Sequence, residues 1–595
     1  MLLSIMYTFS AIGIIYILFL LRKSDEMQEG FIWLPICYLV YECLISLIAS
    51  IYTILHIPAN LLTLGFTNFF FALVGAIWLK KKQNIQRYYF KIENLLFYLT
   101  LIVLIFFLGY ERFGSNFQIC FETSDPASHL KIAIDTINNQ SVITTMSPMF
   151  ITPFTNGIFI QILSPIFQDV DTYKSFIIKD LFNLWLCGSI FYSCIHKRIK
   201  TFCGRLLGMG VTVFYLLGYP YNNMLFGFSY LGYSVTIIAF IMFIIDIYME
   251  SKGKNNFILF LISLGCFGIA ESYTPFAPFT FIAVFICIAY KIQQEHGNIF
   301  FSKQFYKTEI QIFLIPSLLT IWFVLIYPRI GNGFVIGNNY GTILSFEGYI
   351  YRNLYSDFLI YLPFALYAVY YQVKKEKIKI VNAVMFMSLF LYSIIAFIGM
   401  YYMVISTYYY YKLNFIMWML LLILFVQGIS LIYANCKEFI YIYGISWGII
   451  FLLWFTNADV KLYEKNVTFN PFPNAHTCFE IFKYNNSIRE RKTTISNELV
   501  DICQEVVYNY KKEQQIVMYL GNWLDNYWFE ALTNQRQDVY CSNDPLQFTQ
   551  NYIDGKYGNY LVVAKNDESL AACYALIQDY TVVYENEYGL IIRKD

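Results

Sequence analysis

Residues 226–249, FGFSYLGYSVTIIAFIMFIIDIYM, decide the fold class, because they form one apolar run that contains a single charged residue, Asp246. A helix that crosses the hydrocarbon core of a membrane needs about 20 mostly apolar residues. The run meets that length, so it predicts a transmembrane helix.

Similar apolar runs recur along most of the chain. Its 595 residues are 58% hydrophobic and only 14% charged, whereas an average soluble domain is roughly 25% charged. This composition excludes a soluble enzyme, a disordered protein and a coiled coil. It predicts a mainly α polytopic membrane protein with about fourteen transmembrane helices, at 3–21, 31–53, 61–79, 94–110, 179–195, 206–220, 226–249, 256–271, 274–291, 310–328, 357–373, 380–402, 413–435 and 440–457.

The basic residues indicate how these helices are oriented. Every second gap between the expected spans, starting at residue 22, belongs to one set, and this set holds 21 of the 28 Lys and Arg residues of 1–458. Basic residues near helix ends stay in the cytoplasm, so this set is expected inside a multi-pass cell-membrane protein. The N-terminus is then outside, together with the seven remaining basic residues: Arg112, Lys131, Lys174, Lys179, Arg329, Arg352 and Lys412.

The composition changes after the last expected span. Residues 459–595 carry 13 basic and 19 acidic residues, which is typical of a water-exposed domain. Strands and helices alternate there and predict a small extracytoplasmic α/β domain at 458–595, separate from a membrane domain at 1–457. The expected strands are 515–520, 560–564, 580–584 and 590–593, and the expected helices are 523–533 and 567–577.

The longest outer gap, 111–178, is expected to contain two helices on the outer membrane surface. Leu130, Ala133, Ile134 and Ile137 recur with the spacing of one helix face. Ser124-Asp125-Pro126 predicts the start of that helix, with a capping side chain and a proline in the first turn. The second expected helix runs from Phe154 to Phe167.

Glu122, Asp125 and His129 form the densest polar group of this gap. Asp125 and His129 lie one helical turn apart, and a general base must be a group of this kind on a rigid element. These residues are therefore the candidate catalytic group. The alternative is that Asp125 only caps the helix and that His129 is only an interfacial side chain.

The stretch Asp125-Pro-Ala-Ser-His129 resembles the outer-loop pattern of the GT-C superfamily of integral-membrane glycosyltransferases. Met149-Phe-Ile-Thr-Pro153-Phe-Thr-Asn-Gly157 resembles the aromatic-proline-glycine segment that often follows it. The resemblance implies inverting transfer of a sugar from a polyprenyl-phosphate donor, on the outer face, to a cell-envelope glycan or lipid. It also implies that Asp125 is the base. We assign no cofactor, although a divalent metal ion is possible, and no nucleic-acid partner.

Such a donor releases a phosphate, which needs a nearby cation. The candidates are Arg329 and Arg352, at the second long outer gap, and Lys412, within a run of tyrosines. Lys412 has an alternative reading as an interfacial lysine that extends towards the membrane surface. Glu271, at a tight outer turn, is a candidate for lining the same cavity.

Asp169-Val-Asp171 matches a short metal-binding pattern, but a solvated turn at the start of a helix explains it better. Two other functions fit an architecture of this kind. One is a transporter or a flippase of lipid-linked envelope precursors, although the expected spans are nearly free of charge at the midplane, where transporters usually bind their substrates. The other is a non-catalytic assembly protein of the envelope.

Overall fold

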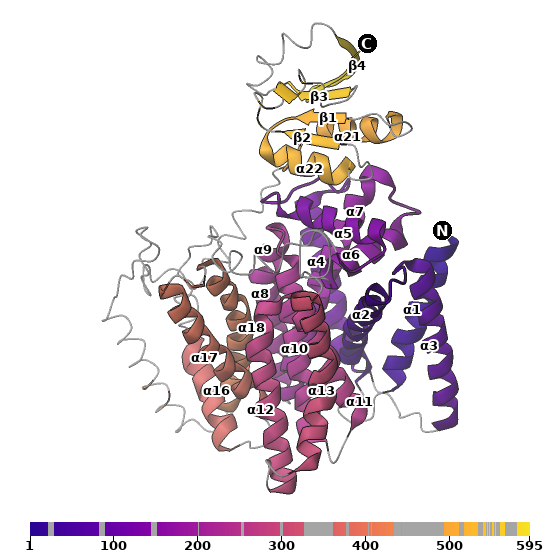
Figure 1. Ribbon diagram of the computed structural model, residues 1–595. Coiled ribbons are helices and arrows are strands. Elements are labelled where there is room, and N and C mark those ends of the chain that lie inside the picture. The colour runs from indigo at the N-terminus through magenta and orange to yellow at the C-terminus, as the bar shows by residue number, and fades with distance from the viewer. Residues whose placement is uncertain are drawn as a thin grey trace.

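The computed structural model describes residues 1–21, 29–82, 90–143, 151–199, 201–251, 255–297, 302–326, 361–375, 380–402, 404–405, 407–432, 493–510, 517–533, 539–542, 560–565 and 580–594, with a few single positions between 442 and 554. Most of these residues are helical, and a small sheet lies near the C-terminus (Figure 1).

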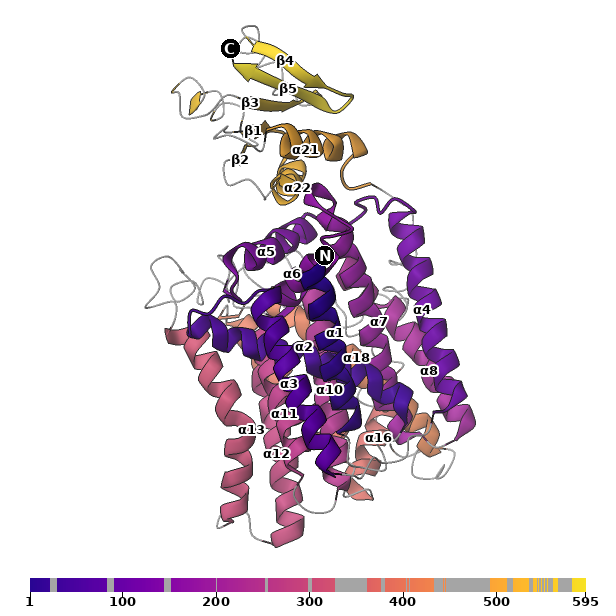
Figure 2. The ribbon, with the colours of Figure 1, turned by 90° about the vertical axis from the view of Figure 1, so that its right-hand side faces the viewer.

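The helices of the first part form one bundle, with their long axes roughly side by side (Figures 1 and 2). They are α1 (Leu2–Leu20), α2 (Gly30–Ile54), α3 (Leu61–Lys82), α4 (Ile92–Phe113), α7 (Thr172–Arg198), α8 (Phe202–Leu217), α9 (Tyr219–Leu225), α10 (Ser229–Glu250), α11 (Asn256–Ser272), α12 (Ala277–His296), α13 (Lys303–Ile321), α16 (Leu362–Lys374), α17 (Val381–Tyr401) and α18 (Thr407–Ile432). Short turns η2 (Asp169–Asp171), η3 (Thr274–Phe276) and η4 (Trp322–Ile326) adjoin α7, α12 and α13.

Nine helices of the described part are long and apolar enough to cross a membrane. The described chain is therefore that of a polytopic, mainly α membrane protein. The count of fourteen spans stays a prediction. The span expected at 440–457 lies largely outside the described residues, and α7, α11, α13 and α16 do not meet the same criteria of length and apolarity.

Helix α10 contains most of the apolar run that indicated the fold class. It begins at Ser229, so 226–228 lie in the preceding turn, and nearly all of its residues are buried inside the bundle. Helices α7 and α11 pack against it. Because α10 is enclosed by other parts of the protein, the buried polar side chains that it carries face other helices.

Helices α5 (Asp125–Asn139) and α6 (Ile151–Leu163) lie across one end of the bundle (Figure 2). The start of α5 and its buried face, with Leu130, Ala133 and Ile134, are as expected. Helix α6 runs from Ile151 to Leu163 rather than from Phe154 to Phe167, and most of its residues are buried; its position on the outer membrane surface stays a prediction. Gly157 permits this close packing, since a Cβ there would lie 2.7 Å from the Ala133 carbonyl oxygen of α5.

The C-terminal part is a five-stranded sheet with two helices. The strands β1 (Val517–Leu520), β2 (Val539–Ser542), β3 (Tyr560–Ala564), β4 (Tyr580–Glu585) and β5 (Gly589–Lys594) have the order β2-β1-β3-β5-β4. The first three neighbours are parallel, whereas β5 and β4 are antiparallel additions. The helices are α21 (Asn497–Asn509) and α22 (Trp523–Thr533).

The expected strands coincide with β1, β3, β4 and β5, and the helix expected at 523–533 is α22. Strand β2 and helix α21 were not expected. The helix expected at 567–577 and the domain boundary at 457/458 lie outside the described residues.

Helix α22 joins the sheet to the membrane bundle, because it packs on α5 (Figure 1). Lys131 of α5 pairs with Glu530 of α22. The rings of Phe121 and Trp528 stack with their centroids 5.7 Å apart. The residues that precede α21 also bind this region, since Thr494 donates its backbone N–H to the Ile119 carbonyl over 2.7 Å. The first turn of α5 therefore has the bundle on one side and the C-terminal sheet beyond the other.

Candidate functional site

The segment before α5 is held to the bundle by hydrogen bonds of its backbone and short side chains. The backbone N–H of Glu122 donates to the Leu225 carbonyl over 2.9 Å, and the Thr123 hydroxyl donates to the Phe226 carbonyl over 2.9 Å. The Thr123 hydroxyl also accepts the backbone N–H of Asp125 over 3.3 Å. These bonds fix Asp125 against the turn that leads into α10.

Glu122 has a partner of its own in this segment. Its carboxylate pairs with the guanidinium of Arg112, which is buried at the end of α4 and also donates to the Cys120 carbonyl. Glu122 therefore anchors the loop, and the structure places it in an ion pair rather than in the cavity described below.

Gly227 allows the turn to touch the start of α5. Its φ is +81°, a conformation that favours glycine. A Cβ at this position would lie 2.7 Å from Pro126 Cδ and 2.8 Å from Asp125 Cβ. A larger residue would push Asp125 out of its place, so the glycine is required by the contact itself.

A cavity of about 260 Å³ opens beside Asp125. Helices α5, α6 and α7 and the turn before α10 all contribute to it. The residues that line it are Asp125, Ser128, His129, Ile132, Thr152, Pro153, Asn156, Phe176, Gly227, Ser229 and Tyr230. The cavity thus combines a carboxylate, an imidazole, several neutral polar groups and two aromatic rings.

Asp125 faces this cavity without a hydrogen bond to its carboxylate from the described residues. The expected capping bond is absent: Ser124 occupies the cap position, and no side chain there bonds to the first turn of α5. Burial raises the pKa of Asp125, and the charge of Lys412 opposes that rise. A raised pKa makes a carboxylate a stronger base, which suits proton abstraction.

His129 is one turn further along α5 and lines the same cavity. Its ring centroid lies 5.2 Å from that of Tyr230. Burial, together with the charge of Lys412, lowers the pKa of His129 to about 4. The imidazole is therefore neutral at physiological pH and adds no positive charge to the cavity.

Lys412 of α18 approaches the cavity behind Tyr230. Its side chain is only 2% exposed, and its ammonium donates to the Tyr230 hydroxyl over 3.0 Å. Four aromatic rings lie 5.1–5.5 Å from the ammonium: Phe228, Tyr230, Tyr273 and Tyr409. Such rings attract a cation electrostatically. Lys412 is thus buried within the protein, in contact with Tyr230 of the cavity wall.

The other sequence candidates lie elsewhere. Glu271 is buried in the last turn of α11, and its Oε1 atom has no partner among the described residues, but it does not line the cavity. Arg329 and Arg352 lie outside the described residues. Asp169 and Asp171 form a turn before α7, where Asp171 pairs with Lys174 over 2.9 Å.

Sequence reasoning did not identify Thr152, Asn156 or Tyr230 as site residues. Thr152 and Asn156 fall inside the segment that resembles the superfamily, so that segment contained a signal. No sequence signal distinguishes Tyr230 from the other tyrosines that begin or end the spans.

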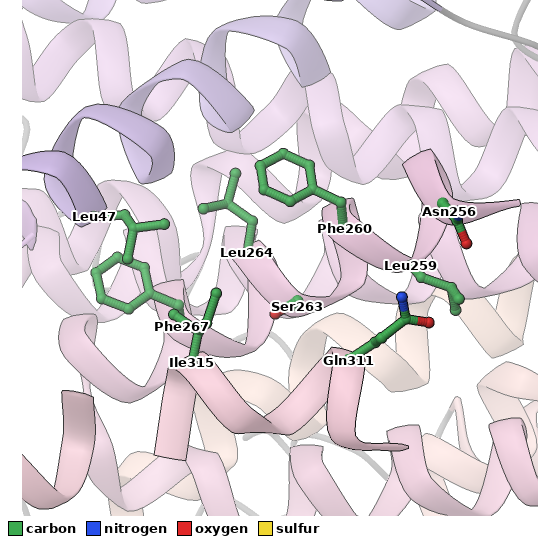
Figure 3. Close-up of a pocket in the computed structure, with 9 residues that line it drawn as sticks. All are labelled: Leu47, Asn256, Leu259, Phe260, Ser263, Leu264, Phe267, Gln311 and Ile315. Carbon is green, nitrogen blue, oxygen red and sulfur yellow. The ribbon is translucent and has the colours of Figure 1, made fainter. Parts of the chain in front are cut away.

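A second, smaller cavity of about 180 Å³ lies between α2, α11 and α13 (Figure 3). Its lining is mostly apolar, with Asn256, Ser263 and Gln311 as the polar exceptions. It contains none of the titratable candidates. In the described parts of the chain, no group of three or more His, Cys, Asp and Glu side chains could hold a metal ion.

Comparisons with known proteins assign the chain to no family. No protein-family model matches it, and no curated protein matches it in sequence. The solved structures that are similar include the Archaeoglobus fulgidus oligosaccharyltransferase in complex with zinc and sulfate, which is 9% identical. The similarity covers 78% of this chain and 67% of that one, with a TM-score of 0.41. At this TM-score, neither the fold nor the activity of that enzyme transfers to this chain.

Proposed function

We propose that the protein is a membrane glycosyltransferase that moves a sugar from a polyprenyl-phosphate donor to a glycan or lipid acceptor of the cell envelope. The observation that supports this most is the cavity beside Asp125. Its lining includes a carboxylate that accepts no hydrogen bond from the described residues, and a buried lysine bonded to the lining residue Tyr230 acts on that carboxylate through its charge.

In the proposed reaction, Asp125 accepts the proton of an acceptor hydroxyl. The acceptor oxygen then forms a bond to the anomeric carbon of the donor sugar while the bond from that carbon to the phosphate oxygen breaks. Attack from the face opposite the phosphate inverts the anomeric configuration. The phosphate leaves on its lipid, and the Lys412 ammonium stabilises the charge that develops on it.

The chemistry uses groups that the described residues provide. Asp125 has a raised pKa, and Lys412 is desolvated among aromatic rings, where its charge acts more strongly than it would in water. Glu122 holds the loop before Asp125 in place through its ion pair with Arg112. His129 is uncharged, so it adds no positive charge next to the base. Among the described residues, no set of metal ligands lines the cavity, and no step here depends on a metal.

The active site is proposed to face the outside of the cell, because the Lys and Arg bias puts the gaps that contain Asp125 there. The proposed donor already carries its phosphate leaving group. A nucleotide-binding site is therefore unnecessary on that side of the membrane.

Asp125→Asn tests the base. General-base catalysis contributes about 10²–10⁴-fold to a rate, so we expect transfer to fall by about 10³-fold, since the amide cannot accept the proton. The measurement is transfer by the full-length protein in membranes, with farnesyl phosphate carrying radiolabelled glucose, mannose or galactose. Thermal unfolding in detergent reports whether the variant is folded.

Asp171→Asn is the matched control, because it removes a carboxylate from the same outer segment but outside the cavity. It is expected to keep its activity. Full activity of Asp125→Asn, with a normal unfolding temperature, would remove Asp125 from the mechanism.

A further inference from the structure

Two polar side chains of α6 face the cavity and have orphaned oxygen atoms. Thr152 and Asn156 lie one helical turn apart and both line the cavity. Their exposed fractions are 5% and 3%. The Thr152 hydroxyl and the Asn156 amide oxygen find no hydrogen-bond partner in the described protein.

Such atoms are unusual in a folded protein. Buried polar groups are nearly always hydrogen-bonded, because leaving one unpaired costs folding free energy. The neighbouring Thr155 shows the ordinary arrangement. It is also buried on α6, but it does not line the cavity, and its hydroxyl donates to the Thr152 carbonyl over 3.2 Å. In the described part of α6, the fully buried side chains with an unpaired atom are therefore those at the cavity wall, whereas Gln161, whose Oε1 is also unpaired, is only partly buried.

The walls of the cavity differ in charge. Asp125 and the Tyr230–Lys412 contact lie at α5 and at the start of α10, whereas α6 presents only neutral donors and acceptors. The charge of Lys412 favours a phosphate at the Tyr230 side of the cavity, and the neutral side chains of α6 favour uncharged hydroxyl groups. A sugar ring bonded to phosphate carries both kinds of group in one molecule.

The size of the cavity sets a limit on that sugar. Pockets for drug-sized ligands enclose about 300–1,000 Å³, and this cavity, at about 260 Å³, is slightly smaller. It suits one sugar ring rather than an oligosaccharide.

We propose that Thr152 and Asn156 bind hydroxyl groups of a single transferred sugar ring and thereby select which sugar the protein accepts. This inference rests on the proposed function above. Neither residue touches the reacting proton in the scheme, so the role is one of specificity.

The experiment measures binding apart from transfer. The full-length protein in lipid nanodiscs is titrated by calorimetry with farnesyl phosphate carrying glucose, mannose or galactose, and with the 2-, 3-, 4- and 6-deoxy analogues of the sugar that binds best. A site built around a hydroxyl rejects the analogue that lacks it. In the unmodified protein we expect at least one deoxy analogue to bind about tenfold more weakly than its parent.

Thr152→Val and Asn156→Leu remove the polar atoms with little change in volume. In each variant we expect the parent sugar to bind about as weakly as the deoxy analogue that lacks the hydroxyl bound by the substituted residue. The tenfold preference for the parent over that analogue should then fall below about twofold. Thr152→Ser restores the hydroxyl and is expected to restore the preference. Thr155→Val, the same substitution at the paired hydroxyl, is expected to keep it.

The outcomes separate this inference from the proposed function. If the protein binds and transfers one of these sugars, but its preference is unchanged in Thr152→Val and Asn156→Leu, the specificity role is overturned and the glycosyltransferase proposal stands. If no single-sugar donor binds, the inference is overturned as well. Asp125→Asn is expected to bind the donors with the wild-type preference although it does not transfer.

Discussion

Two buried lysines, each bonded to or acting electrostatically on a carboxylate and each near a tyrosine of α10, differ in this structure. Lys179 of α7 pairs with Glu42 of α2 over 2.7 Å, and both side chains are at most 4% exposed. Lys412 of α18 acts on Asp125 of α5, which lines a cavity. Helix α10 supplies Tyr233 to the first pair and Tyr230, three residues earlier, to the second.

The carboxylates distinguish the two pairs. Glu42 accepts hydrogen bonds from Lys179, from the Tyr38 hydroxyl over 2.9 Å and from the Tyr233 hydroxyl over 2.8 Å. Asp125 accepts none from the described residues. The first pair is saturated by the protein, which is typical of a structural link between helices. In the second case, Asp125 has no hydrogen bond from the described residues and lines a cavity. This arrangement is typical of a substrate-binding site.

Lys179→Met should have the largest effect, and that effect should be on stability. The change leaves the Glu42 carboxylate buried without its counter-charge, and breaking a buried pair in this way costs about 3–5 kcal/mol. The measurement is the free energy of unfolding in mixed detergent micelles. The double variant with Glu42→Gln is the control, since it removes both charges and should regain most of the loss.

If Lys179→Met were as stable as the unmodified protein, the saturated pair would not be a structural link. The contrast with the Asp125 site would then rest on the cavity alone.

Lys412→Met should lower activity but not stability, which is the opposite of what we expect for Lys179→Met. Removing one group that stabilises a developing oxyanion typically lowers a rate by about 10²–10³-fold, so we expect kcat/KM for the polyprenyl-phosphate donor to fall by about 10²-fold. We expect no loss of stability, because the change removes a buried charge and leaves Asp125 at a cavity that can admit water.

Steady-state kinetics over a range of donor concentrations and thermal unfolding of the same samples test both halves of this prediction. An unchanged dependence on the donor would assign Lys412 a packing role among its aromatic neighbours. A loss of stability as large as that of Lys179→Met would make the two lysines equivalent.

The sequence predicted elements with strong local signals better than it predicted the site. The nine helices that are long and apolar enough to cross a membrane, helix 523–533 and strand 560–564 follow from periodicity and composition alone, and the described residues contain them near the expected positions. Strand β2 is four residues long and takes its place from parallel pairing with β1. Pairing of this kind depends on residues far apart in the chain, which no local pattern encodes.

The site depended on such long-range contacts as well. Asp125 and His129 were predicted because they are adjacent in sequence, and both line the cavity. Glu122 was grouped with them for the same reason, but it forms an ion pair with Arg112 and does not line the cavity. Lys179 was counted among the outer basic residues, yet it is buried against Glu42, 137 positions away. Spacing identifies neighbours on one helix, but it does not identify the partner that decides whether a charge is free.

The smallest expected effect is a shift in pH dependence, and it tests whether Lys412 and Asp125 act as a pair. A general base must be deprotonated, so activity falls as the pH drops through its pKa. Burial raises the pKa of Asp125, which puts the acidic limb of the kcat/KM profile above the ordinary range of an aspartate. Because the charge of Lys412 lowers that pKa, Lys412→Met should move the limb to higher pH.

His129→Gln should leave the limb in place, since burial already lowers the pKa of that imidazole to about 4. A limb that stays fixed in Lys412→Met, or moves with His129→Gln, would separate the two charges and assign the titration to another group.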